Sequence, residues 1–198
     1  SCSLSVFIFL SSTSSINPKY IKGFQLKIFM ESCVLTGNEI RELILKSDLV
    51  QNYIDLDTQI TPNGFDMTVR EVHSIVSEGA VDFSNEKRKL SETKKIDFVE
   101  EFVFLEKGAY KIIYNEIVNI PPNIVALGRP RSTLLRCGAN VGTAVWDRGY
   151  SGRSESLLSV DNEKGIKILK DARVLQLVFM RTLTDESVYK GIFLKENI

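Results

Sequence analysis

The sequence predicts a mainly β fold, a sandwich or a barrel, with one short helix at the start of its organised part. The prediction depends on many short runs rich in β-branched and aromatic residues, with turn signals about every 8 to 12 residues between them. The chain has 198 residues, of which 43% are hydrophobic and 25% charged. This length and composition suit one domain with a sizeable hydrophobic core.

The helix is predicted from its N-terminal cap. Thr36-Gly-Asn-Glu39 is a capping box, in which a hydroxyl at the N-cap is answered by a carboxylate three residues later. Ile40, Leu43 and Ile44 then recur at helical spacing, so we expect the helix to end near Lys46.

Strands follow the helix. Thr61-Pro-Asn-Gly64 is a turn cluster, and Phe65 to Arg70 alternates between apolar and polar residues, as a half-buried strand does. The charged stretch from Phe83 to Glu100 predicts a solvated loop or an excursion at a sheet edge. Further strands are expected at residues 110–118, 124–127, 132–136, 141–146, 154–160, 165–169 and 173–180.

Charge and cysteine content exclude several classes of protein. With 25 basic and 25 acidic residues the net charge is zero, which argues against binding to nucleic acid or to an anionic membrane. Three cysteines and one histidine at no metal spacing argue against a zinc site. We therefore expect a cytoplasmic protein with reduced cysteines.

The N-terminal stretch differs from the rest of the chain. Residues 1–29 are rich in Ser and large apolar residues, and the first methionine is Met30. The apolar run Leu4 to Leu10 is far shorter than the roughly 20 residues of a membrane span, and no basic segment precedes it as in a secretory signal. We expect residues 30–198 to form the domain, with residues 1–29 a disordered extension or a mis-assigned start.

Four separated segments carry a resemblance to a known family. They are Asn63-Gly-Phe-Asp66, Pro130-Arg-Ser-Thr-Leu-Leu-Arg136, Val145-Trp-Asp-Arg-Gly-Tyr-Ser-Gly152 and Ala172-Arg-Val-Leu-Gln176. In this order and spacing they resemble the dUTPase and dCTP deaminase superfamily, closest to the archaeal type of dUTPase. The resemblance implies a distorted β jelly roll, a homotrimer with active sites between subunits, and a pyrimidine deoxynucleoside triphosphate bound with Mg²⁺.

The same resemblance assigns roles to individual residues. Asp147 would orient and deprotonate the water that attacks the α-phosphorus, and the ring of Tyr150 would pack on the deoxyribose. Gly142 to Tyr150 would form a hairpin whose backbone reads the uracil edge. The remaining roles are phosphate and substrate contacts for Arg131, Ser132, Gln176 and Arg136, and outer-shell support of Mg²⁺ through water for Asp66.

Two chemistries share this resemblance. The expected activity is that of a dUTP diphosphatase, which hydrolyses dUTP to dUMP and pyrophosphate; the alternative is a dCTP deaminase, alone or bifunctional. The deaminase branch has a proton-shuttling glutamate where this chain has Leu157, and Glu155 on the same strand face is too distant, which favours the hydrolase. Arg136 and Thr143-Ala144 look deaminase-like, and the C-terminus lacks the Gly-rich arm typical of trimeric dUTPases.

Overall fold

The computed structural model describes residues 33–183 and 187–198. The extension expected at residues 1–29 lies outside these residues. The described residues belong to one compact unit, Ser32–Ile198. Within them, no helix is long and apolar enough to cross a membrane.

The fold is mainly β, as predicted, and forms the distorted jelly roll that the resemblance implied. Its helices are α1 (Gly37–Ser47), α2 (Leu56–Gln59) and α3 (Ser132–Arg136). Its strands are β1 (Val50–Gln51), β2 (Ile60–Thr61), β3 (Gly64–Ile75), β4 (Thr93–Ile96), β5 (Phe102–Leu105), β6 (Gly108–Tyr114), β7 (Ile117–Asn119), β8 (Ile124–Pro130), β9 (Ala139–Gly142), β10 (Val145–Trp146), β11 (Ser151–Gly152), β12 (Glu155–Val160), β13 (Ile166–Leu169) and β14 (Arg173–Arg181).

Helix α1 confirms the predicted cap. The Thr36 hydroxyl accepts a hydrogen bond from the backbone of Glu39, whose carboxylate in turn accepts from the Thr36 backbone. Ile40 and Ile44 are buried, and Asp48 ends the helix in the left-handed conformation. The short apolar stripe that predicted the helix is therefore the face that packs on the sheets.

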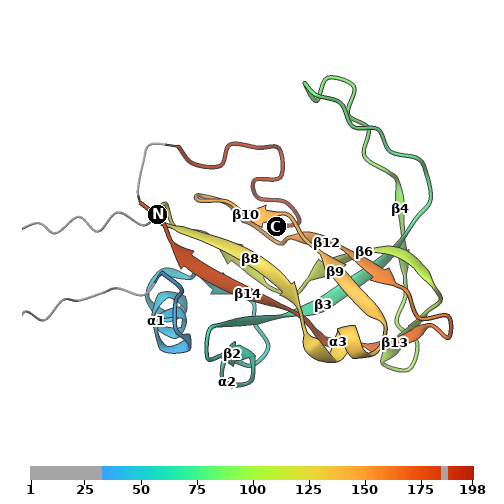
Figure 1. The fold of residues 1–198 in the computed structure, drawn as a ribbon, viewed down its shortest axis with the longest axis horizontal. Helices are drawn as coiled ribbons and strands as arrows, with labels where there is room; N and C mark the ends of the chain where they lie inside the picture. The colour runs from blue at the N-terminus through green and yellow to red at the C-terminus, as the bar shows by residue number, and fades with distance from the viewer. Residues whose placement is uncertain (1–32, 184–186) are drawn as a thin grey trace, which may run out of the picture. The chain divides into compact units, whose positions relative to one another are not determined.

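One large sheet holds most of the strands, in the order β10-β8-β14-β3-β6-β12-β9, and β2 and β4 also pair with β3. Figure 1 shows β8 and β14 running side by side through the body. Two smaller sheets consist of β1-β7-β11 and β13-β5. The hydrophobic core contains Phe65, Tyr114, Leu158, Leu175 and Phe179 from strands of the large sheet, all essentially inaccessible to solvent.

Strand β3 connects the two halves of the large sheet. Its first half pairs with β14, placing Asp66 opposite Gln176, and its second half pairs with β6, placing Val72 opposite Ile112. The register shifts in both ladders, next to Arg173 on β14 and next to Val69 on β3 itself. Such irregularities bend a strand, which lets one strand serve both halves of a curled sheet.

A buried polar network covers the polar face of β3. The carboxylate of Glu116, fully buried, accepts hydrogen bonds from the Thr68 backbone N–H (3.0 Å), the Thr68 hydroxyl (2.6 Å) and Gln59 Nε2 (2.7 Å). Gln59 Nε2 also donates to the backbone oxygen of Asp66 (2.8 Å). The alternation from Phe65 to Arg70 predicted a half-buried strand. Asp66 and Thr68 on its polar face are nevertheless buried, each with polar partners, and only Arg70 on that face is exposed.

One predicted strand is wrong. Residues 132–136 form helix α3 instead of a strand, with Arg131 as the N-cap residue. Ser-Thr-Leu-Leu-Arg has only one buried side chain, Leu134, and its two leucines favour a helix. Gly138, with a φ of 75°, takes the left-handed conformation after the helix and redirects the chain into β9.

Two other predicted strands are each divided in two. The run expected at residues 110–118 is broken after Tyr114, where β6 ends, and the run at 141–146 is broken at Thr143-Ala144 between β9 and β10. The first interruption contains Glu116, the buried carboxylate described above. The second lies a few residues before Asp147, one of the predicted site residues.

The charged stretch predicted at Phe83–Glu100 is in part an edge excursion, and its residues Thr93–Ile96 form strand β4. Residues 76–92 project from the body before β4 returns along the edge of β3 (Figure 1). Val81 and Phe83 near the tip are almost fully exposed. Backbone hydrogen bonds between Ala80 and Lys89 hold the two sides of the excursion together.

Candidate active site

Arg131 and Ser132 lie where β8 gives way to α3. Pro130 is the last residue of β8, and Arg131 follows in an extended conformation as the N-cap residue of α3. The backbone N–H of Arg131 donates to the carbonyl oxygen of Val174 (3.0 Å), which fixes this junction to β14. Ser132 is exposed at the first position of the helix.

Asp66 is the centre of a compact ionic group, the Asp66 cluster, formed by Asp66, Arg131, Arg173 and Gln176. A single carboxylate oxygen, Oδ2, lies 3.0 Å from Arg131 Nε and 3.3 Å from Arg173 Nη1. Burial raises the pKa of the Asp66 carboxyl, and the two arginines oppose that rise. The cluster therefore presents two cations around one buried anion.

Gln176 joins the cluster through the pairing of β14 with β3. It lies opposite Asp66, and its Nε2 donates to the Thr61 hydroxyl (2.6 Å). Gly64 permits this close approach, because a Cβ there would lie 2.4 Å from the Leu177 carbonyl oxygen and 2.8 Å from Gln176 Nε2. The predicted turn at Thr61–Gly64 thus packs directly against the predicted glutamine.

A tight turn sets the positions of Asp147 and Tyr150. The Tyr150 N–H donates to the Asp147 carbonyl oxygen (3.1 Å), and Gly149 between them has a φ of 79°. This is the pattern of a type II turn, which needs glycine at its third position. The turn leaves the Asp147 side chain exposed and turns Tyr150 inward.

Tyr150 anchors a second group, the Tyr150 cluster, formed by Asp147, Tyr150, Ser154, Tyr189 and Glu196. The Tyr150 hydroxyl donates to Glu196 Oε1 (2.7 Å) and lies 3.0 Å from the Ser154 hydroxyl, and the ring meets Tyr189 edge-on at 5.7 Å. Burial raises the pKa of the Tyr150 hydroxyl above its ordinary value. These residues, together with Trp146 and Phe193, line a pocket of about 210 Å³.

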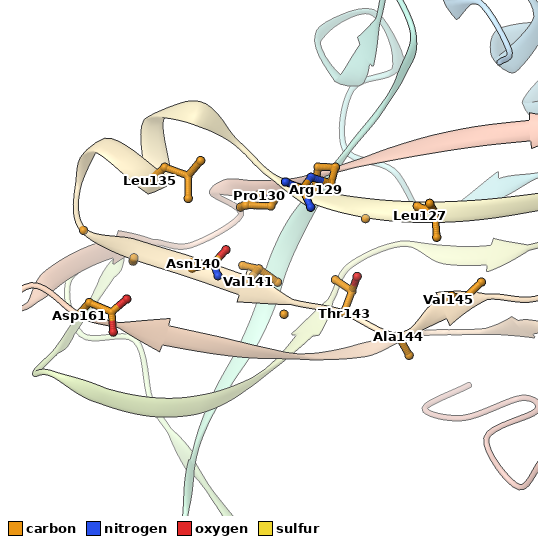
Figure 2. Close-up of a pocket in the computed structure, with 14 residues that line it drawn as sticks. Leu127, Arg129, Pro130, Leu135, Asn140, Val141, Thr143, Ala144, Val145 and Asp161 are labelled. Carbon is orange, nitrogen blue, oxygen red and sulfur yellow. The ribbon is translucent and has the colours of Figure 1, made fainter.

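A larger pocket of about 710 Å³ lies beside the segment that leads to Asp147. Figure 2 shows Leu127 and Arg129 of β8 on one wall and Asn140, Thr143 and Val145 on the opposite wall. None of the seven predicted site residues lines it. Its wall nevertheless includes Gly142–Val145, the first part of the hairpin predicted to read the base.

The structure brings the predicted residues together in two groups and leaves one apart. Asp66, Arg131 and Gln176 meet in the first cluster, with Ser132 next to Arg131, and Asp147 and Tyr150 meet in the second. Within the described residues, no hydrogen bond or ion pair joins the two clusters. Arg136 is exposed on α3 and donates back to the Ser132 carbonyl oxygen (3.1 Å).

Sequence reasoning missed Arg173, Tyr189 and Glu196. Arg173 stands inside Ala172–Gln176, one of the segments that carry the family resemblance, so the sequence did place a cation at the start of this strand. Its contact with Asp66 joins residues 107 positions apart, which no local pattern reveals. Glu196 and Tyr189 lie in the C-terminal segment, which lacks a Gly-rich arm and so offered no motif from which to predict them.

Comparisons with known proteins assign the family. The model of the dCTP deaminase-like family matches residues 34–182. The chain is 51% identical over 168 residues to the "Probable deoxyuridine 5′-triphosphate nucleotidohydrolase" of Methanococcoides burtonii, covering 83% of this chain and 99% of that protein. It is 39% identical over 155 residues to the deoxyuridine 5′-triphosphate nucleotidohydrolase of Methanocaldococcus jannaschii, covering 76% and 98%.

A solved structure agrees on the fold. The dCTP deaminase of Agrobacterium tumefaciens aligns with a TM-score of 0.60 at 20% identity, over 76% of this chain and 48% of that one. The matched family model covers both the Asp66 cluster and the turn that carries Asp147 and Tyr150. The chain therefore belongs to the dCTP deaminase-like family and resembles, over nearly their whole length, archaeal members named deoxyuridine 5′-triphosphate nucleotidohydrolases.

Proposed function

We propose that this protein is a dUTP diphosphatase that hydrolyses dUTP to dUMP and pyrophosphate by attack of water on the α-phosphate. The observation that carries the proposal is the identity of 51% to a relative named for this activity, over 99% of that relative's length. The dCTP deaminase-like family model by itself fits either chemistry, so the residues near the site have to distinguish them.

The residues on β12 favour hydrolysis over deamination. Leu157, which stands where the deaminase branch has its glutamate, is exposed on the strand and cannot transfer a proton. Glu155 lies on the same face and is paired with Lys111 at 3.0 Å. Neither residue supplies the proton shuttle that attack on a cytosine ring would need.

The two clusters suit the two ends of the substrate. Arg131, Ser132 and Gln176 offer a guanidinium fork, a hydroxyl and an amide to phosphate oxygens. Asp147, exposed at the rim of the smaller pocket, would orient the attacking water, and the buried ring of Tyr150 would limit space at the sugar. Arg136, whose side chain here donates to the Ser132 carbonyl oxygen, would contact substrate once that hydrogen bond is exchanged.

Mg²⁺ is part of the same proposal. Among the described residues, no group of three or more His, Cys, Asp or Glu side chains could hold a metal ion. Mg²⁺ commonly keeps several waters and binds through one or two carboxylates and substrate phosphates. Asp66 fits this use, because both arginines contact Oδ2 while Oδ1 has no hydrogen bond to a described residue. When bound, the ion would neutralise charge on the phosphates.

A homotrimer with active sites between subunits completes the proposal. The two clusters hold complementary parts of one site, yet no contact within the described residues of this subunit joins them. Closed symmetric assembly would bring the Asp66 cluster of one subunit to the Tyr150 cluster of the next. Cytoplasmic location is proposed with it, as the compartment of deoxynucleotide metabolism.

One incubation tests the proposal against its alternative. The full chain is given dUTP or dCTP with Mg²⁺, and pyrophosphate and ammonia are followed together. We expect pyrophosphate from dUTP and no ammonia from dCTP. Ammonia from dCTP would identify a deaminase, and the absence of both products would remove the enzymatic proposal.

A further inference from the structure

We infer that the charged excursion, residues 76–92, is an assembly arm whose apolar tip docks into the larger pocket of a second copy of this chain. The inference rests on the homotrimer of the proposed function and names two surfaces that would meet in it. The contact would have the usual anatomy of an interface, apolar at its centre and charged at its rim.

The tip of the excursion presents apolar side chains on a well-fixed loop. Val81 and Phe83 are almost fully exposed. Between them, the Asp82 carboxylate accepts a hydrogen bond from the Ser84 hydroxyl (2.9 Å), and backbone hydrogen bonds hold the two sides of the excursion together. A fixed loop loses little conformational entropy on binding, and an exposed Phe gains nothing from burial in its own subunit. Both features favour a partner that covers the tip.

The larger pocket offers a matching apolar surface (Figure 2). Its wall exposes Leu127, Leu135 and Val145 by 41%, 52% and 49%. Strands β9 and β10, which contribute to this wall, are the two ends of the large sheet, and open sheet edges are commonly covered by another element. The pocket volume of about 710 Å³ leaves room for the side chains of Val81 and Phe83 together.

The tip does not fill the pocket of its own subunit, because Phe83 is fully exposed there. The excursion leaves the body where β3 pairs with β4, whereas the pocket lies between β8 and β9 (Figure 1). About eight extended residues on each side give the arm a reach of about 25 Å, enough to extend beyond its own subunit. A contact of tip to pocket is heterologous, and such contacts close into a ring when the rotation between copies allows it.

The charges around the two surfaces are complementary. The tip carries Glu86 and Lys87, and the pocket is lined by Arg129 and Asp161. Among the described residues, none of these four side chains forms an ion pair. Docking would bring Glu86 to Arg129 and Lys87 to Asp161, and opposite charges at a rim fix the register of an interface.

A cross-link between the two surfaces tests the inference in the full chain. Cys137 is exposed and directly precedes Gly138, which lines the pocket, and Ser84 is exposed at the tip. With the other two cysteines replaced by serine, we expect a short bismaleimide to join S84C to Cys137 of a second copy, giving linked copies on a denaturing gel. Addition of C137S should abolish the product. Absence of a link with S84C, or a link that persists with C137S, would overturn the inference.

Sedimentation over a concentration series measures the strength of the contact. We expect F83S to raise the concentration at which the assembly half-dissociates by about tenfold or more, as loss of one buried aromatic side chain does. The matched control F104S replaces another exposed phenylalanine, on β5, and should stay within about twofold. An assembly of F83S as tight as that of the wild type would contradict the inference, as would a wild type that stays monomeric.

Release of pyrophosphate from dUTP is followed separately, so the inference and the proposed function can fail independently. An S84C variant that forms the Cys137-dependent link yet leaves dUTP intact would refute only the proposed function. A chain that releases pyrophosphate but forms no such link would refute only the assembly arm.

Discussion

Gly149 is the residue that decides where the proposed water-orienting carboxylate stands. Its φ of 79° is costly for any residue with a side chain, and a Cβ there would lie 2.8 Å from the Cβ of Val188. The turn itself is closed by the backbone of Asp147 and Tyr150. The Asp147 carboxylate makes no hydrogen bond to a described residue, so it is available for the reaction.

Replacement of Asp147 should separate activity from folding. We expect D147N to lower dUTP turnover by about 10²-fold or more, as loss of a positioned general base does, with an unchanged melting temperature. The steady-state rate of pyrophosphate release and a thermal melt measure the two effects. D97N, which alters another exposed aspartate far along the chain, serves as the control, and full turnover by D147N would refute the role of Asp147.

At the scale of elements, the position of strand β3 is stabilised by hydrogen bonds to the fully buried carboxylate of Glu116. Glu116 accepts three hydrogen bonds, and burial raises its pKa above the ordinary value. Two of the donors belong to Thr68, and the third, on Gln59, also holds the backbone of Asp66. The network thus joins α2, β3 and the start of β7 directly behind the Asp66 cluster.

Removal of the Glu116 carboxylate should destabilise the folded protein. E116A would leave several buried donors unpaired, so we expect the free energy of unfolding to fall by about 2 kcal/mol or more. Urea unfolding followed by tryptophan fluorescence would measure the loss. The control E42A removes an exposed carboxylate paired with Lys46 and should change stability by at most about 0.5 kcal/mol. Equal urea midpoints for E116A and the wild type would contradict this account of β3.

The C-terminal segment is a second element with a specific anchor. Glu196 binds the Tyr150 hydroxyl, and its backbone oxygen accepts from the Arg153 N–H (3.0 Å). Burial raises the pKa of the Glu196 carboxyl, and the nearby Glu155 raises it further. Docking of this segment should therefore respond to pH.

The sign of that response follows from the raised pKa. The folded protein holds the Glu196 proton more tightly than the unfolded chain, so the contribution of this group is fully present below pH 4.5, its unfolded value, and is lost as the pH rises through the raised pKa. Relative to E196Q, which does not titrate, the wild type should lose thermal stability across this window. Melting temperatures from acid to neutral pH would show it, with E106Q following the wild type. Parallel curves for E196Q and the wild type would contradict the prediction.

For the whole molecule, the separation of the two clusters is the feature that bears on assembly. Each cluster carries half of the proposed chemistry, and each is held by contacts within its own part of the subunit. A site shared between subunits would explain why the two sets of residues are built independently. Activity would then require assembly.

Mixing two inactive variants tests a shared site. When equal amounts of D147N and R131Q subunits are unfolded together and reassembled, one of the three sites in each mixed trimer should contain both intact clusters and release pyrophosphate from dUTP. Each variant treated alone is the control. Failure of mixed trimers, verified by mass, to regain activity would place both clusters of a site on one subunit.

Much of this architecture could be predicted from local sequence, and the errors have physical causes. The capping box at Thr36 and most strands were confirmed because short-range patterns encode them. The segment 132–136 became a helix because its surroundings bury only Leu134, a fact that depends on tertiary contacts. Arg173 was overlooked because its partner Asp66 is distant in sequence, and the roles of the seven predicted site residues stay predictions.

The course of strand β3 has a consequence for how the chain folds. Its start can pair with β2 and its second half with β6 soon after synthesis, but the pairing of its first half with β14 has to wait for distant residues, as the 107-residue separation of Asp66 and Arg173 illustrates. Such distant pairings pay their loop-closure entropy before they gain contact energy, which makes them slow. The Asp66 cluster is therefore among the last parts of the molecule to form, and a nascent chain that lacks β14 carries Asp66 without the arginine and glutamine that β14 supplies.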